Sequence, residues 1–67
     1  MCSFGENLKN IRKQNKISQK AFAVLMSTTQ QRVSEWECNK VEPSLYNIKK
    51  IIKVLNTTFE ELTEGID

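Results

Sequence analysis

Apolar residues recur along this chain at spacings of three and four, and no stretch alternates regularly between apolar and polar positions. Spacings of three and four place side chains on one face of an α-helix, whereas a half-buried strand needs strict alternation. The apolar series are Phe4, Leu8 and Ile11; Phe22 and Met26; Val33 and Trp36; and Leu45, Ile48, Ile51, Ile52 and Leu55. The pattern therefore predicts an all-α domain.

The starts and ends of the predicted helices carry their own signals. An oxygen-bearing side chain at the N-cap accepts a hydrogen bond from a backbone N–H that the first turn leaves unpaired. Ser3 with Glu6 and Thr58 with Glu61 fit the capping box, and Ser18, Thr29 and Ser44 stand at the other N-caps. The expected ends are Asn15 or Lys16, Ser27 with Thr28, Asn39, and Asn56, and Pro43 separates the third helix from the fourth. Five short helices follow, at about residues 4–14, 19–26, 30–38, 45–55 and 59–64.

Residues 19–38 have the pattern that a helix-turn-helix requires. Two helices that cross steeply need a small residue where they touch, a small or flexible residue in the turn, and apolar residues on the inner side of the second helix. The residues at these positions are Ala23, Ser27, Val33 and Trp36. The second helix of such a unit is the one that enters the major groove of DNA.

This segment resembles the phage repressor, Cro and Xre type of transcriptional regulators. The matching run is ISQKAFAVLMSTTQQRVSEWECNKVEPSL, residues 17–45, and the likeness extends from FGENLKNIRK at the start to residues 55–62. Its marks are the Ser-Gln pair, the spaced Ala23, Trp36 with Glu37, the following Asn-Lys and the E-P-S-L run. The resemblance implies a compact five-helix lambda-repressor-like DNA-binding domain over residues 1–67, with its second and third helices as the helix-turn-helix.

Five positions depart from the pattern of that family. Ser27 and Asn39 stand where its members usually have glycine, and Cys38 stands where asparagine is common. Asparagine tolerates a positive φ, and serine does so less readily. Val24 and Leu25 fall where charged or polar residues are usual, which puts two apolar side chains on an exposed or contact surface.

The predicted recognition helix, residues 30–38, presents a polar face outward. A step of 100° per residue, with Val33 in the core, defines that face. The residues on it, which we expect to read bases, are Gln30, Gln31, Ser34 and Glu35. Glutamine can pair with adenine through two hydrogen bonds, and glutamate can accept from the cytosine amino group. The TTQQ run also resembles the recognition-helix start of a lambdoid phage repressor, which implies that both glutamines contact bases.

Two alternatives stay open for this face. Gln30 and Gln31 can be plain solvated residues at a helix start. Glu35 can serve only to exclude wrong sequences, because a carboxylate that faces DNA opposes the phosphates unless it meets a cytosine.

Phosphate contacts are expected from residues that border the groove. They are Ser18, Gln19, Thr29, Arg32, Asn39 and Lys40. Ser18 and Gln19 lie at a helix N-terminus, where amide hydrogens and the helix dipole favour an anion. Arg32 can contact a phosphate or a guanine edge. For Gln19, Asn39 and Lys40 the family resemblance implies the phosphate contact.

Glu37 lies on the core side of its helix, where a carboxylate is costly without a partner. Arg12, which follows the core-facing Ile11, is the expected partner. A matching Arg and Glu often form this bridge in the resembled family. We therefore interpret both residues as structural, and Trp36 as a core residue.

The charge is uneven along the chain, although the net charge is only +2. In residues 7–41 seven basic residues oppose two acidic ones, and from Glu42 onward three lysines oppose five acidic residues. A domain with one face on phosphates has this asymmetry. The distribution therefore agrees with DNA binding by the first two thirds of the chain.

Composition argues against several other classes of protein. The 67 residues include no histidine, no glycine-rich phosphate loop and no nucleophile within reach of a base, so we expect neither an enzyme nor a metal, cofactor or small-molecule substrate. We find neither a signal peptide nor a membrane span, and therefore expect a cytoplasmic protein. In that reducing compartment Cys2 and Cys38 are expected to be free thiols rather than a disulfide.

One short recognition helix reads only about four base pairs, so proteins of this kind usually bind two half-sites. We therefore expect a homodimer that represses transcription from a near-palindromic operator in double-stranded DNA. The expected dimer edge is Val54, Thr58 and Ile66, while Phe59 and Leu62 close the core of each copy. The alternative is a protein-interaction module, such as an antitoxin, with weak or lost DNA affinity.

Overall fold

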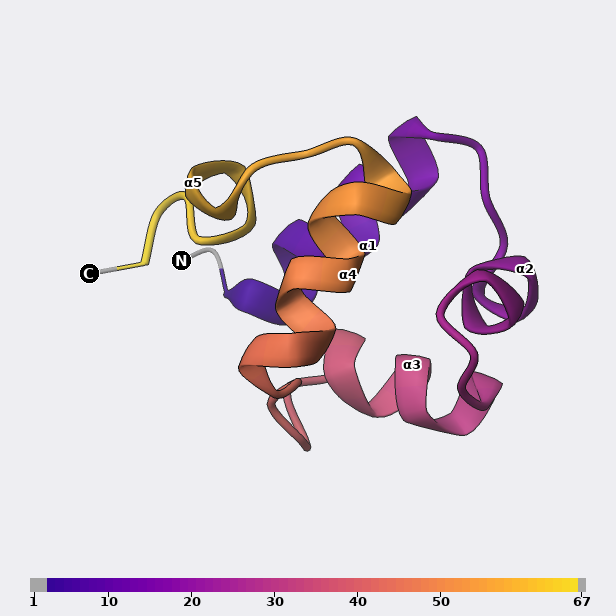
Figure 1. Ribbon diagram of the computed structural model, residues 1–67. Coiled ribbons are helices and arrows are strands. Elements are labelled where there is room, and N and C mark those ends of the chain that lie inside the picture. Colours follow the sequence, from indigo (N-terminus) through magenta and orange to yellow (C-terminus); the bar gives the residue numbers. More distant parts are fainter. Residues whose placement is uncertain (1–2, 67) are drawn as a thin grey trace.

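A computed structural model describes residues 3–66 of the chain, which form five helices and no strand (Figure 1). The helices are α1 (Phe4–Gln14), α2 (Gln19–Leu25), α3 (Gln30–Glu37), α4 (Leu45–Leu55) and α5 (Phe59–Leu62). The predicted all-α, five-helix architecture is confirmed, and α2, α3 and α5 end one or two residues earlier than expected. None of the helices in residues 3–66 has the length and hydropathy that a bilayer-crossing segment needs.

The N-cap of each helix is the serine or threonine that was predicted from the sequence. The capping residues are Ser3, Ser18, Thr29, Ser44 and Thr58. Each side-chain oxygen accepts a hydrogen bond from the backbone N–H three residues later, at 3.0 to 3.2 Å. A cap of this kind stabilises a helix by about 1 kcal/mol, so local sequence sets all five starts.

The first four helices share one way of ending. The residue that leaves each helix has a positive φ, and these residues are Lys16, Ser27, Asn39 and Asn56. The N–H of the next residue then bonds to a carbonyl five residues earlier, at 2.9 to 3.3 Å, as in a Schellman motif. None of the four is glycine, although a left-handed conformation favours glycine, so Lys16 and Ser27 hold backbone strain.

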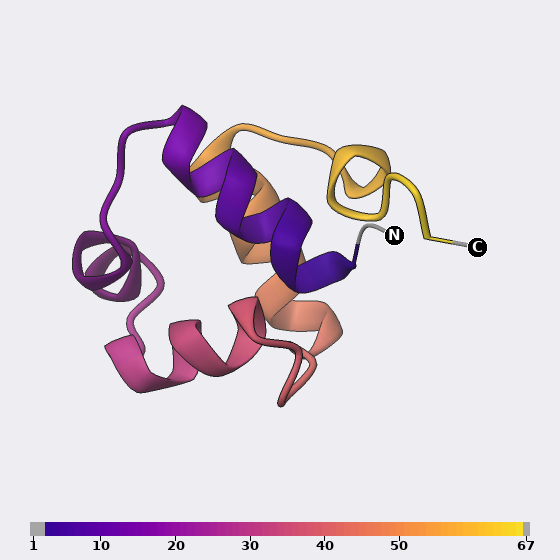
Figure 2. The same ribbon diagram turned by 180° about the vertical axis from the view of Figure 1, so that it is seen from behind.

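The core lies between α1 on one side, α4 on the other, and the α2 and α3 pair. Its fully buried side chains are Leu8, Phe22, Val33, Trp36, Ile51, Leu55 and Leu62. α1 lies behind α4 in Figure 1 and in front of it in Figure 2, with α2 and α5 at opposite ends of the molecule. Because α3 gives Val33 and Trp36 to this core, its opposite face is left outside.

A buried amide attaches α5 to α1. Asn7 Nδ2 donates to the carbonyl oxygens of Leu62 at 2.9 Å and Glu64 at 2.8 Å. Asn7 is 8% exposed, so a polar group is buried there only because carbonyls at the end of a short helix accept its hydrogens. The bonds fix where the C-terminal segment lies.

We expect Thr57→Val to stabilise the protein. Thr57 Oγ1 is buried and has no hydrogen-bond partner within the described residues. A valine of the same shape removes that desolvated hydroxyl, so the free energy of unfolding should rise by about 1 kcal/mol. Urea denaturation measures the change, with Thr58→Val as the matched control, because Thr58 caps α5 and its loss should cost about 1 kcal/mol. A destabilised Thr57→Val would mean that an ordered water satisfies the hydroxyl.

Candidate nucleic-acid interface

α2 and α3 form a helix-turn-helix around a closed turn. The turn runs through Ser27, whose φ is 57°, and Thr28, whose N–H donates to the carbonyl of Ala23 at 2.9 Å. Ala23 and Val33 are buried in the same core, at 3% and 0% exposed. The inner faces of α2 and α3 therefore pack in the core, and the outer face of α3 is exposed to solvent.

The outer face of α3 carries the residues expected to read bases. Gln30 and Gln31 are exposed in its first turn, and Ser34 and Glu35 are half-buried further along. The structure also pairs Arg32 with Glu35, Nε to Oε1 at 3.8 Å. This pair, which the sequence analysis missed, brings a positive charge beside the carboxylate and lowers its repulsion of phosphates.

The capping hydroxyls border this face. Ser18 Oγ accepts from the N–H of Ala21 at 3.0 Å, and Thr29 Oγ1 accepts from that of Arg32 at 3.1 Å. A hydroxyl that accepts in this way keeps its own hydrogen to donate. Both groups can therefore donate to a phosphate oxygen without leaving their caps, and Lys40 is exposed at the other end of α3.

Two of the residues expected on phosphates also hold the protein together. Asn39 Oδ1 accepts from the N–H of Gly5 at 3.0 Å, and its Nδ2 donates to Ser3 Oγ at 2.9 Å. Gln19 Nε2 donates to Glu37 Oε1 at 3.0 Å. Each amide nitrogen keeps a second hydrogen, so a phosphate contact is still open to both side chains. Neither structural role was predicted from the sequence.

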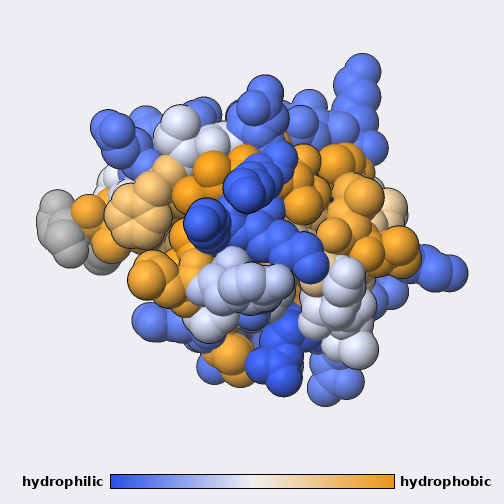
Figure 3. Space-filling view, in the orientation of Figure 1, coloured by the Kyte–Doolittle hydropathy of each residue, from blue (hydrophilic) through white to orange (hydrophobic). Residues whose placement is uncertain are grey.

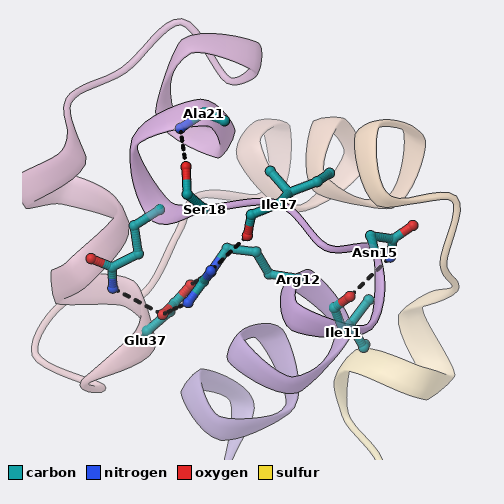
Figure 4. A network of polar contacts seen from close by, with 8 residues as sticks. Ile11, Arg12, Asn15, Ile17, Ser18, Ala21 and Glu37 are labelled. Carbon is teal, nitrogen blue, oxygen red and sulfur yellow. Dashed lines mark hydrogen bonds and ion pairs between the residues drawn. The ribbon is translucent and has the colours of Figure 1, made fainter.

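Arg12 and Glu37 are brought together in a buried, two-pronged pair (Figure 4). Arg12 Nε donates to Glu37 Oε2 at 2.6 Å and Nη2 donates to Oε1 at 3.1 Å, with side chains 8% and 2% exposed. Arg12 Nη1 also donates to the carbonyl of Ile17 at 2.7 Å, just before α2 begins. This network joins α1, the N-terminus of α2 and the end of α3, so it sets the relative position of the two helices of the motif.

Gly5 is a further positioning residue that the sequence analysis did not single out. A Cβ there would lie 2.4 Å from the carbonyl oxygen of Glu37 and 2.7 Å from that of Trp36. The first turn of α1 therefore packs directly on the backbone at the end of α3. The available signal was a glycine inside a predicted helix, where glycine is unfavourable by about 1 kcal/mol relative to alanine.

The residues expected at the dimer edge have different surroundings. Val54 is half-buried against the core, Thr58 caps α5, and Ile66 is 44% exposed. Phe59 was expected to close the core, and this was wrong, since it is 54% exposed whereas Leu62 is fully buried. The cause is that α5 has four residues, and a helix of one turn gives the core one large side chain.

Phe59 and Ile66 instead border an apolar groove of about 260 Å³ between the start of α1 and the segment before α4. Its other apolar lining residues are Phe4, Trp36, Val41, Pro43 and Ile48. Exposed apolar surface of this kind suits contact with another chain. It lies beside Ile66, one of the residues expected at the dimer edge.

The structure describes one of the two cysteines. Cys38 is an exposed free thiol at the end of α3, and Cys2 lies outside the described residues. Within residues 3–66 no three histidine, cysteine, aspartate or glutamate side chains are grouped so as to hold a metal ion.

We expect Ser27→Gly to stabilise the fold by about 0.5 to 1 kcal/mol, because glycine adopts the left-handed conformation of this turn without strain. Thermal melting measures the effect. Ser34→Gly is the matched control, since glycine inside α3 should cost about 1 kcal/mol. If both variants were destabilised alike, the turn would not hold strain at Ser27.

Comparison with known proteins agrees with this geometry. The helix-turn-helix family profile matches residues 8–62. The chain is also 32% identical over 62 residues to the SPbeta prophage-derived uncharacterized HTH-type transcriptional regulator YonR of Bacillus subtilis (strain 168), a match that covers 92% of this chain and 57% of that protein. The chain thus spans little more than half the length of that relative. From the fold and the profile together, the chain belongs to the helix-turn-helix family of the Cro, C1 and Xre type, whose members are DNA-binding transcriptional regulators and not enzymes.

Proposed function

We propose that this protein is a sequence-specific transcriptional regulator that places α3 in the major groove of double-stranded DNA. The observation that carries the proposal is the exposure of Gln30 and Gln31 on the first turn of a helix whose opposite face is buried. Each glutamine side chain can donate to and accept from an adenine edge. The half-buried Ser34 and Glu35 continue the same face, with Arg32 beside the carboxylate.

Phosphate contacts on both sides of α3 would fix its position in the groove. The proposed donors are Ser18, Gln19, Thr29, Arg32, Asn39 and Lys40. Ser18 and Gln19 present the N-terminus of α2, and Lys40 follows the end of α3, so the set brackets the recognition helix. Arg32 could contact either a phosphate or a guanine edge, because its ion pair with Glu35 is long, at 3.8 Å, and partly exposed.

The protein is further proposed to act in the cytoplasm as a homodimeric repressor on a near-palindromic operator. Support comes from the exposed apolar side chains of Phe59 and Ile66, which border a groove that a second copy would cover. Thr58 and the partly exposed Val54 lie near them along the chain. Two copies would read two half-sites, and occupancy of the operator would block transcription.

Selection from random duplex DNA with the purified protein tests this function. An enriched near-palindrome, with half-sites about ten base pairs apart, is the result expected of a dimeric reader. A salt titration on the selected duplex should give a log-log slope of several units, because phosphate contacts release counterions. Absence of enrichment would favour the interaction module, for which Val24 and Leu25, 72% and 50% exposed, are the supporting observation.

Gln31→Ala is expected to weaken binding to the selected duplex roughly 5-fold to 150-fold, as for loss of one bidentate base contact. The melting temperature should not change, because Gln31 is exposed. Lys40→Ala should weaken binding to all sequences and lower the salt slope by about 1. Gln14→Ala, an exposed glutamine at the end of α1, is the control. Equal affinity of the Gln31→Ala and parent proteins would remove Gln31 from the base-reading set.

A further inference from the structure

A row of lysines on α4 adjoins the C-terminal end of α2. Lys49, Lys50 and Lys53 line a shallow hollow of about 280 Å³ together with Tyr46. Their spacing from Tyr46 puts all four on one face of the helix. Lys50 Nζ donates to the carbonyl of Met26 at 3.1 Å, which ties this face of α4 to the end of α2.

The end of α2 contributes apolar surface to the same region. Val24 is 72% exposed and Leu25 is 50% exposed, and Lys20 lies one turn before Val24. Figure 3 shows the apolar side chains over α2 next to the hydrophilic ones that extend from α4. A charged border around exposed apolar residues is typical of a surface that contacts another molecule.

The charge of this region has one sign. The segments QKAFAVL of α2 and LYNIKKIIKVL of α4 contain four lysines and no acidic residue. A positive surface could also bind phosphates. Val24 and Leu25, however, would make no favourable contact with a nucleic-acid backbone, because burying apolar side chains is favourable only against apolar groups. Complementarity therefore requires acidic and apolar side chains together.

We propose that this region docks an acidic amphipathic segment of a partner protein. The region, defined by Lys20, Val24, Leu25, Tyr46, Lys49 and Lys53, is called the α2–α4 surface. The apolar side of the segment covers Val24 and Leu25, and its carboxylates face the lysines of α4. None of these residues belongs to the proposed DNA-reading set, so the inference adds a protein-binding function and does not depend on the operator.

The test uses the whole protein and a fluorescent helical peptide of about four turns, with leucines at spacings of three and four flanked by glutamates. Fluorescence anisotropy at physiological salt should show saturable binding. The paired substitution Val24→Glu and Leu25→Glu should weaken it roughly tenfold or more, and so should Lys49→Glu with Lys53→Glu. The melting temperature should stay unchanged in both, and so should the salt slope of binding to the selected operator duplex, because neither pair contacts a phosphate.

Controls separate this proposal from its alternatives. A peptide with lysine in place of each glutamate should not bind, and Phe59→Glu, on the opposite end of the molecule, should leave peptide binding intact. Peptide binding that ignores the α2–α4 substitutions would overturn the proposal. A change in the sedimentation of the protein alone on Val24→Glu would overturn it in favour of a second copy. A lower salt slope of operator binding in the lysine variant would overturn it in favour of a DNA contact.

Discussion

Gly5→Ala is expected to lower the free energy of unfolding by about 3 kcal/mol, at the upper end of the usual cost of overpacking. The added Cβ would lie 2.4 Å from the carbonyl oxygen of Glu37 and 2.7 Å from that of Trp36. Both oxygens belong to the backbone of α3, so no side-chain rotation can relieve the contact. α1 and the end of α3 must separate, which also strains the bond from the N–H of Gly5 to Asn39 Oδ1.

Thermal melting followed by circular dichroism measures this loss. For a domain of this size 1 kcal/mol shifts the melting temperature by roughly 4–8 °C, so a decrease of roughly 12–24 °C is expected. Asn10→Ala, exposed on the same helix, is the control and should change stability by less than about 0.5 kcal/mol. A Gly5→Ala protein that melts with the parent would contradict the close approach of α1 and α3.

The elements of this fold were predictable because their signals are local. A capping hydroxyl and the amide that donates to it lie three residues apart, so Ser18 and Thr29 predict the starts of α2 and α3 from local sequence. Apolar spacing then sets the face that each helix buries, which is why Val33 and Trp36 were placed correctly in the core. The residues that are not on the buried face of α3 form its outer face, so the exposure of Gln30 and Gln31 was predictable as well.

Contacts between distant residues were harder to predict. Asn39 contacts Gly5 and Ser3, which lie more than thirty residues away along the chain, and its side chain looks like that of any exposed turn residue in the sequence. Asn7 likewise finds its partners in the C-terminal segment. Propensity and periodicity contain no information on such pairs, since both depend only on neighbours within a few turns.

Charge counted along the chain misled in one respect. From Glu42 onward the acidic residues outnumber the lysines, so this part of the chain was treated as an acidic end. In the structure the lysines gather on α4 and most of the acids follow in and after α5. A net charge summed along the sequence therefore combined the lysines of α4 with the acidic residues near α5, although these lie on different elements of the fold.

The Arg12 and Glu37 pair was expected because Glu37 lies on the core side of its helix. The contacts of this pair with the start of α2 were not expected. Arg12 Nη1 donates to the carbonyl of Ile17, and Gln19 Nε2 donates to Glu37 Oε1. Both added contacts lie beside the N-terminus of α2, where Ser18 and Gln19 are proposed to meet phosphate. The buried pair therefore links the stability of the domain to the placement of a proposed DNA contact.

Glu37→Leu is expected to destabilise the protein by about 3–5 kcal/mol, the usual cost of leaving one partner of a buried pair without the other. Arg12, 8% exposed at its side chain, would keep a positive charge whose remaining side-chain hydrogen bond, among residues 3–66, is to the Ile17 carbonyl. Since a domain of this size has on the order of 5 kcal/mol in total, the variant should keep about 2 kcal/mol of stability or less.

The double variant Arg12→Met with Glu37→Leu separates charge from shape. Replacing both partners removes the buried charge, so stability should recover by about half of the loss, which urea denaturation can measure. Recovery stays incomplete because the carbonyl of Ile17 loses a donor, at a cost of about 1–3 kcal/mol. If Glu37→Leu alone cost less than about 1 kcal/mol, the pair would be solvated as surface pairs are, and α2 would not be held through it.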